Sequence, residues 1–391
     1  MKISVILISH DESEQEINTQ LKCIACQQLQ PYELIFIDTS KNKVFEDTFN
    51  DYFKSNQNLN HKYFHSPDAY PGLARNVGVH KSTGDVLAFL DMKTKPSKDW
   101  LIRSKSLGDN GVECILGTTY FEAKNTLQNL YKASTYGEVI HTTLPGTIIY
   151  RDAFFRVGEF NSNVRAGEDI LWKNAALKIL DCIIPEQETL KYHGLPNSFF
   201  KLVKKYIRYS FDGAILDVQH NVKTGYLTLF LILTFLIIPR WNYLFTGWDE
   251  SFFYIEDVTK KGYLFILILF ICYAVIKKIF NTADRSPLFN VGKYISYLIV
   301  FLIVIRWNAV LTDFTESASL YIPHITKIFL ASVIVLSIIF RGIIKPLSNG
   351  VRLNKLFPFF WFQVGLIGSF LDMIRAPIYV TGSVIGVFKS K

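Results

Sequence analysis

The sequence is poor in charge and in cysteine, and both shortages narrow the classes of protein to which it can belong. Only 19% of the 391 residues are charged, whereas 49% are hydrophobic, which is unusual for a simple soluble domain. The five cysteines form no regular framework, which argues against a small fold held by disulfides. Cys23 and Cys26 form one Cys-x-x-Cys pair. Because no second pair completes a metal site, we interpret them as small residues one turn apart on a helix.

Two other features are missing. The net charge is +8, but the first half holds no basic run with interleaved aromatic residues, so we expect no nucleic-acid partner. Met1 and Lys2 lead directly into an apolar strand without a small-residue cleavage site, and we expect no signal peptide. Together with the cysteine pattern, this predicts a reducing, cytoplasmic environment for the N-terminal part.

The hydrophobic residues are concentrated in the second half of the chain. Residues 1–215 have the mixed composition of a globular α/β domain, and residues 216–355 contain four apolar segments whose cores are a little shorter than the roughly 20 residues that cross a bilayer. These segments are 225–239, 262–280, 291–311 and 325–344. The sequence therefore predicts an α/β domain followed by an all-α membrane domain of about four helices. The alternative is a set of buried helices in a large soluble protein.

Lys and Arg are distributed unevenly between the loops that join these segments. Residues 312–324 contain neither, and acids outnumber the basic residues of 240–261, whereas residues 277–293 and 341–355 are rich in both. The positive-inside rule then predicts a multi-pass protein of the inner (plasma) membrane with its N-terminal domain in the cytoplasm. Asp372, Arg375 and Pro377 interrupt the apolar tail 356–391, for which we expect a hairpin or an interfacial helix.

The N-terminal domain begins with the pattern of a nucleotide-binding sheet. Residues 3–9 and 33–38 are apolar runs typical of buried parallel strands, and residues 16–28 between them have helical spacing. Such a unit predicts a nucleotide crevice at the carboxyl ends of the strands, where Ser9, His10 and Asp38 lie. A third strand, 85–90, ends on Asp91 and places another acid at this edge.

Five motifs in this order resemble family 2 glycosyltransferases of the GT-A fold. They are the strand into Ser9-His10-Asp11-Glu12, the strand and turn 33–40, Pro71-Gly72-Leu73-Ala74-Arg75-Asn76, Thr83-Gly84-Asp85 through Asp91, and Gly167-Glu168-Asp169. The resemblance covers about the first 210 residues and implies a Rossmann-like domain that binds a nucleotide-sugar donor.

The resemblance also implies roles for individual residues. Asp38 matches the acid that binds the nucleotide base, with Ser9 and His10 beside it, and Asp91 matches the first acid of the D-x-D motif near the ribose and the metal. Asp169 matches the general base of an inverting transfer, and Glu168 would orient the acceptor. His193 lies where related enzymes place a histidine near the diphosphate. We include Arg75 as a donor-binding candidate.

Each of these residues also has a purely structural interpretation. Asp38 and Asp91 could be turn formers, Glu168 and Asp169 could complement a helix dipole, and Arg75 could simply begin a helix after a Pro-Gly turn.

One position departs from the family pattern. Lys93 stands where the second acid of the motif is expected, so coordination of Mg or Mn by Asp91 is in doubt. We predict that Lys93 supplies positive charge to the donor diphosphate directly. The alternative is that Lys93 marks a lost activity.

A basic amphipathic helix is expected near 199–210. Its basic residues, which are Lys201, Lys204, Lys205 and Arg208, would contact anionic membrane lipids and bring a lipid-linked glycan acceptor to the site. The chain lacks the Gln-x-x-Arg-Trp tract of processive synthases in this family, so we expect transfer of one sugar in surface polysaccharide assembly. The alternatives are a polyprenyl-phosphate monosaccharide synthase and a catalytically inactive membrane scaffold.

Overall fold

The computed structural model describes residues 1–42, 45–55, 59–216, 218, 250 and 325–389. The chain divides into two units, one formed by Met1–Val222 together with Arg341–Lys391 and the other by Lys223–Phe340. Each is described by itself.

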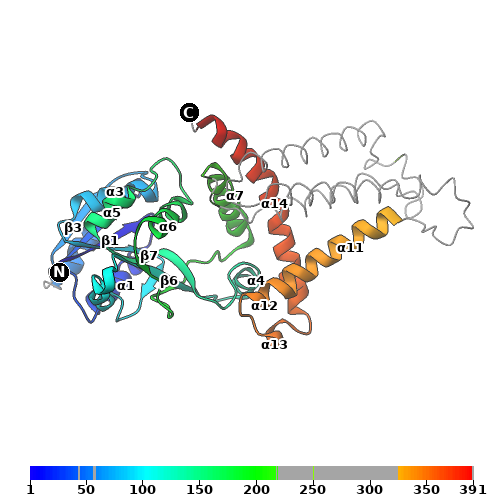
Figure 1. Ribbon diagram of the computed structural model, residues 1–391, viewed down its shortest axis with the longest axis horizontal. Helices are drawn as coiled ribbons and strands as arrows, with labels where there is room; N and C mark the ends of the chain where they lie inside the picture. The colour runs from blue at the N-terminus through cyan, green and yellow to red at the C-terminus, as the bar shows by residue number, and fades with distance from the viewer. Residues whose placement is uncertain (43–44, 56–58, 217, 219–249, 251–324, 390–391) are drawn as a thin grey trace, which may run out of the picture. The chain divides into compact units, whose positions relative to one another are not determined.

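The first unit is built on a nine-stranded mixed sheet (Figure 1). The strand order is β3-β2-β1-β4-β7-β6-β9-β5, with β8 paired to β6. Strands β1 to β4 pair in parallel, whereas β7 runs antiparallel to both β4 and β6. Their bounds are β1 Ile3–Ser9, β2 Glu33–Asp38, β3 His61–His65, β4 Val86–Asp91, β5 Thr94–Pro96, β6 Cys114–Phe121, β7 His141–Tyr150, β8 Cys182–Ile183 and β9 Leu190–Tyr192.

Helices pack on both faces of the parallel strands, because alternate residues of a strand point to opposite faces. Val5 and Leu7 of β1 belong to one apolar core with Ile17 and Leu21, whereas Ile6 belongs to a second core. The helices are α1 Glu14–Ala25, α2 Glu46–Ser55, α3 Pro71–Lys81, α4 Thr126–Thr135, α5 Arg151–Val157, α6 Glu168–Ile179 and α7 Phe199–Ile215, with short 3-10 turns at Leu101–Ser106 and Asp109–Gly111. The predicted strands and the α/β fold of the N-terminal part are confirmed.

The register of the parallel strands brings the predicted acids to one edge. Ser9 lies opposite Asp38 on β2, and the preceding residue, Ile8, lies opposite Asp91 on β4. Three neighbouring strands therefore end at the same level, where a nucleotide crevice is expected.

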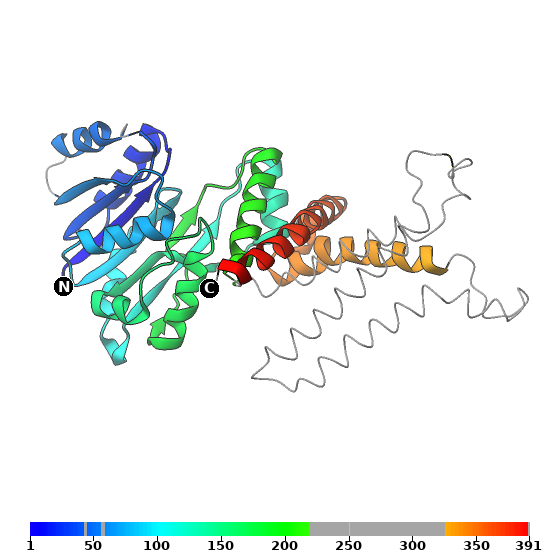
Figure 2. The same cartoon turned by 90° about the horizontal axis from the view of Figure 1, so that it is seen from above.

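The C-terminal residues fold back onto the first unit. They form α12 Lys345–Ser348, α13 Leu353–Leu356 and α14 Phe360–Lys389, and α14 packs along α7 and α4 (Figure 2). Leu371 of α14 is fully buried in a cluster with Leu202 and Tyr206 of α7. The tail is thus not a hairpin, because α14 continues through Pro377 as one helix. The interfacial position of this helix stays a prediction.

Among the residues that it describes, the structure does not support an expected transmembrane helix. The predicted segments 225–239, 262–280 and 291–311 lie outside the described residues. Of the fourth, it describes α11, Ile325–Ile339, followed by a π-helical turn at Phe340–Ile344. Within the described ranges, no helix combines the length and the apolar character that a membrane crossing needs.

Candidate active site

Arg75 joins the predicted catalytic acids to the end of β4. Its Nη1 donates a 2.8 Å hydrogen bond to Glu168 Oε1, and its Nη2 lies 3.0 Å and 3.2 Å from the two carboxylate oxygens of Asp91. The side chains of Arg75 and Glu168 are each only 4% exposed, whereas that of Asp91 is 32% exposed. Both arms of the guanidinium are therefore occupied by carboxylates, which is the geometry of a positioning residue. A direct contact of Arg75 with the donor stays a prediction.

Burial and neighbouring charges act in opposite directions on the pKa values of this cluster. Desolvation raises the pKa of Glu168 to about 7, although Arg75 works in the opposite direction and Asp169 adds to the rise. Burial disfavours the charge of Arg75, but Asp91 and Glu168 outweigh it and raise the pKa of this guanidinium. Glu168 Oε2 is buried without a hydrogen-bond partner in the described part of the chain. This oxygen of Glu168 can therefore still accept a hydrogen bond.

Asp169 lies at the start of α6, beside Glu168. The preceding residue, Gly167, has a φ of +92°, a left-handed conformation that strongly favours glycine. A Cβ there would also lie only 3.3 Å from Val218, just past the end of α7. This turn starts the helix with two adjacent acids, where the helix dipole stabilises negative charge. Asp169 is half-buried, and its Oδ1 accepts a 2.8 Å hydrogen bond from the amide of Ile170.

The residues predicted for the nucleoside lie together at the ends of β1 and β2. Asp38 is fully buried, and its carboxylate accepts hydrogen bonds from the Tyr63 hydroxyl at 2.6 Å and the Ser40 amide at 3.0 Å. His10 is placed between the two strand ends, with Nδ1 3.1 Å from Thr39 Oγ1. Its other nitrogen lies 2.6 Å from a guanidinium nitrogen of Arg165.

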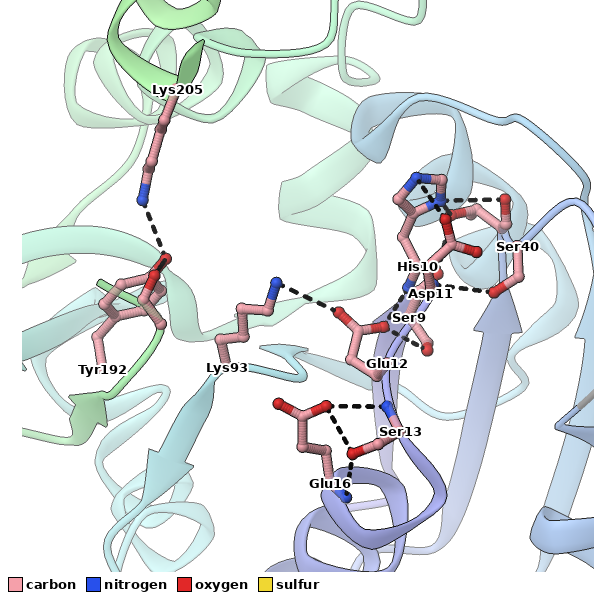
Figure 3. Close-up of polar contacts among 12 residues, drawn as sticks. Ser9, His10, Asp11, Glu12, Ser13, Glu16, Ser40, Lys93, Tyr192 and Lys205 are labelled. Carbon is pink, nitrogen blue, oxygen red and sulfur yellow. Dashed lines mark hydrogen bonds and ion pairs between the residues drawn. The ribbon is translucent and has the colours of Figure 1, made fainter. Parts of the chain in front are cut away.

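Glu12 organises the turn that follows β1 (Figure 3). It accepts a 2.8 Å hydrogen bond from the Ser9 hydroxyl and a further one from the amide of His10. Burial raises the pKa of Glu12, partly offset by these hydrogen bonds and by Lys93.

Strand pairing also brings Lys93 and His193 together. Thr94 pairs with Tyr192 in the antiparallel β5 and β9 ladder, and the amide of His193 donates a 3.1 Å hydrogen bond to the carbonyl of Lys93. The Lys93 ammonium lies 3.8 Å from Glu12 Oε1, so it points toward the end of β1 (Figure 3). His193 is half-buried, and desolvation lowers its pKa, which favours the neutral imidazole.

The residues around Asp91 do not fit a divalent cation. Both oxygens of Asp91 face Arg75, and the residue two positions later is a lysine. Among the residues that the structure describes, no group of three or more His, Cys, Asp or Glu side chains could hold a metal ion. Because Mg and Mn require several oxygen ligands, we derive no step through a metal.

The sequence interpretation missed several neighbours of the site. Glu12 is part of a quoted motif and Arg165 lies two residues before another, but only the fold shows their contacts with His10. The prediction that Lys205 contacts lipid is wrong. Its ammonium donates a 3.1 Å hydrogen bond to the Tyr192 hydroxyl instead. Its three basic neighbours on α7, which are Lys201, Lys204 and Arg208, are exposed, and their contact with lipid stays a prediction.

The N-terminal domain is similar to known glycosyltransferases. Residues 4–163 match the family model described as Glycosyl transferase family 2. The chain is 25% identical over 288 residues to the glycosyltransferase AglE of Haloferax volcanii, with 69% of this chain and 91% of the relative covered. It is 27% identical over 215 residues to an uncharacterised glycosyltransferase of Rickettsia conorii, with 51% of this chain covered but only about a third (34%) of that relative's length.

Among solved structures, a mannosyltransferase of Pyrobaculum calidifontis, in complex with GDP-Man and Mn2+, matches with a TM-score of 0.46 and 14% identity. The match covers 95% of this chain and 86% of that one.

Proposed function

We propose that this protein, whose residues 4–163 form a family 2 glycosyltransferase domain, is a glycosyltransferase that transfers one sugar from a nucleotide donor to a lipid-linked glycan acceptor. The observation that carries the proposal is the link made by Arg75. It ties the acid pair that begins α6 to Asp91, at the sheet edge where Ser9, His10 and Asp38 lie, the residues predicted for the nucleoside. The proposed base for the acceptor and the residues proposed for the donor are therefore linked at one edge of the sheet.

The proposed reaction needs a base on one side of the sugar and positive charge on the other. The acceptor hydroxyl attacks the anomeric carbon and forms a new C–O bond, while its proton passes to the carboxylate of Asp169. The bond between the anomeric carbon and the phosphate oxygen breaks, and its electron pair leaves with the nucleoside diphosphate. Lys93 stabilises the charge that develops there. Attack from the face opposite the leaving group inverts the anomeric configuration.

A lipid-linked acceptor is supported by the outer surface of α7 and α14. Phe200 of α7 and Phe370 of α14 are exposed, at 76% and 38% of their surface, and so is Phe359, the residue before α14, at 76%. Lys201, Lys204 and Arg208 are exposed on the same α7. Aromatic and basic side chains on one helix are typical of a surface that rests on a bilayer with anionic lipids. We therefore propose that the enzyme works at the cytoplasmic face of the inner membrane in surface polysaccharide assembly.

The test is transfer by the purified full-length protein from a panel of nucleotide sugars to a polyprenyl-diphosphate-linked acceptor, with EDTA present. We expect turnover with one donor. The Asp169→Asn variant should transfer at least about 100-fold more slowly, since a general base contributes 10²- to 10⁴-fold. Asp152→Asn, which changes an exposed acid in the first turn of α5, is the matched control and should keep the wild-type rate.

Two results would contradict this proposal. Full activity of Asp169→Asn in restoring the glycan to cells that lack the protein would favour an inactive scaffold. Complete loss of transfer with EDTA, restored by Mg or Mn, would refute the role of Lys93 in place of a metal.

A further inference from the structure

We propose that Lys205 of α7, together with Tyr192 and Lys93, forms an anion subsite that binds the diphosphate of the donor without a metal ion. This inference rests on the proposed function, because it assigns the subsite to a nucleoside diphosphate. It extends the donor site from the sheet edge to a helix outside residues 4–163, the part that matches the family model.

Lys205 is anchored on Tyr192. Its ammonium lies 3.1 Å from the Tyr192 hydroxyl and 5.2 Å and 5.3 Å from the ring centres of Tyr192 and Tyr209. Burial raises the pKa of Tyr192 to about 12, so the hydroxyl stays protonated at neutral pH. It donates its proton to the carbonyl of Gly194 at 3.0 Å and accepts from Lys205. The phenol therefore orients the ammonium but does not neutralise it.

Lys93 borders the same space from the opposite side. A Cβ built on Gly194 would lie 2.7 Å from Cδ of Lys93 and 2.8 Å from the hydroxyl of Tyr192, so these two side chains meet at Gly194. Figure 3 shows Lys205 reaching this region from α7 and Lys93 from the turn that leads into β5. The stem of Lys93 thus lies beside Tyr192, and its ammonium, which extends toward Glu12, is near enough to Lys205 to lower the pKa of that lysine.

The positive charges of the two lysines are not fully compensated by nearby carboxylates. In the described part of the chain, Lys205 makes no ion pair with a carboxylate, and Lys93 reaches only Glu12 at the long distance of 3.8 Å. The carboxylate of Asp91 is already bound by Arg75. A half-buried ammonium whose hydrogen-bond partner is a neutral hydroxyl is poorly compensated, and burial and Lys93 lower its pKa accordingly. The two linked phosphates of a diphosphate would satisfy both lysines at once.

The experiment measures binding of inorganic pyrophosphate to the full-length protein in EDTA, by isothermal titration calorimetry. We expect saturable binding to the wild type and a 10- to 100-fold weaker affinity for Lys205→Met and for Lys93→Met, the loss of one charge-assisted hydrogen bond each. Lys205→Arg keeps the charge and should retain most of the affinity. Lys178→Met removes an exposed lysine from the last turn of α6, about 15 Å from Glu168, and should bind as the wild type does.

Unchanged pyrophosphate affinity in Lys205→Met would overturn the subsite, as would a wild type that binds pyrophosphate only with Mg or Mn. If Lys205→Met melts at a lower temperature, Lys205→Arg decides the case. Normal folding of that variant with affinity as weak as that of Lys205→Met would also overturn the subsite. The proposed function fails separately: a protein that binds pyrophosphate through Lys205 but turns over no nucleotide sugar keeps the subsite and loses the transferase assignment.

Discussion

At the residue scale, the site is organised by one cation that serves two acids. Arg75 is almost completely buried between Glu168 and Asp91, so each of its guanidinium arms satisfies a carboxylate from a different element. Since a buried ion that loses its partner keeps its desolvation cost, the three groups depend on one another. The same residue thus fixes the beginning of α6 against the end of β4.

We predict that Arg75→Met lowers the free energy of unfolding by about 3–5 kcal/mol, because Glu168 would stay buried without its cation. Denaturant titration followed by circular dichroism measures this change. Arg156→Met is the matched control, since Arg156 forms an ion pair with Glu113 while half-exposed, and its loss should cost no more than about 1 kcal/mol. Equal losses of unfolding free energy in the two variants would show that the buried ion pairs of Arg75 stabilise the fold no more than an exposed ion pair does.

At the element scale, the buried parallel strands could be predicted from sequence, whereas the antiparallel half of the sheet could not. Strands β1 and β2 are continuous apolar runs because both of their faces are covered, and this pattern is visible in the sequence. Strand β5 has three residues and β8 has two, too few to show any periodicity. Since β5 and β9 bring Tyr192 beside Lys93, only the part of Lys93 in the anion subsite could be predicted from sequence.

For helix α7, too, the sequence predicted the element but not the contacts of its side chains. Its basic amphipathic pattern was recognised, but composition alone does not tell which turn of a basic helix faces a bilayer and which faces the protein. Lys205 differs from Lys201 and Lys204 only because Tyr192 lies beneath it. That contact joins residues 13 positions apart, on β9 and on the middle of the helix.

We predict that replacing Lys201, Lys204 and Arg208 by Gln weakens binding of the full-length protein to anionic vesicles by roughly 100-fold at low salt, from about 1 kcal/mol per basic residue. Binding to neutral vesicles should hardly change. Vesicle sedimentation measures both. The matched control replaces Lys98, Lys105 and Lys178, three exposed lysines outside α7, and should retain wild-type binding. A loss of equal size in this control would mean that only the net charge matters.

At the scale of the whole molecule, the two ends of the chain form one unit. Residues 341–391 belong with residues 1–222, and α14 packs on α7, the helix that carries Lys205. The tail was expected to form a separate segment. Its return could not be predicted, because it depends on contacts such as that of Leu371 with Leu202, which are far apart in the sequence.

This packing makes a distant substitution act on the proposed donor site. We predict that Leu371→Ala lowers the free energy of unfolding of the first unit by about 2–5 kcal/mol, the usual cost of truncating a fully buried leucine. Amide hydrogen exchange should become faster along α7, because that helix loses packing against Leu202 and Tyr206. Leu366→Ala, on the same helix but 45% exposed, is the control and should change exchange in α7 little. Unaltered protection of α7 amides in Leu371→Ala would show that α7 is held by residues 1–222 and does not depend on packing against α14.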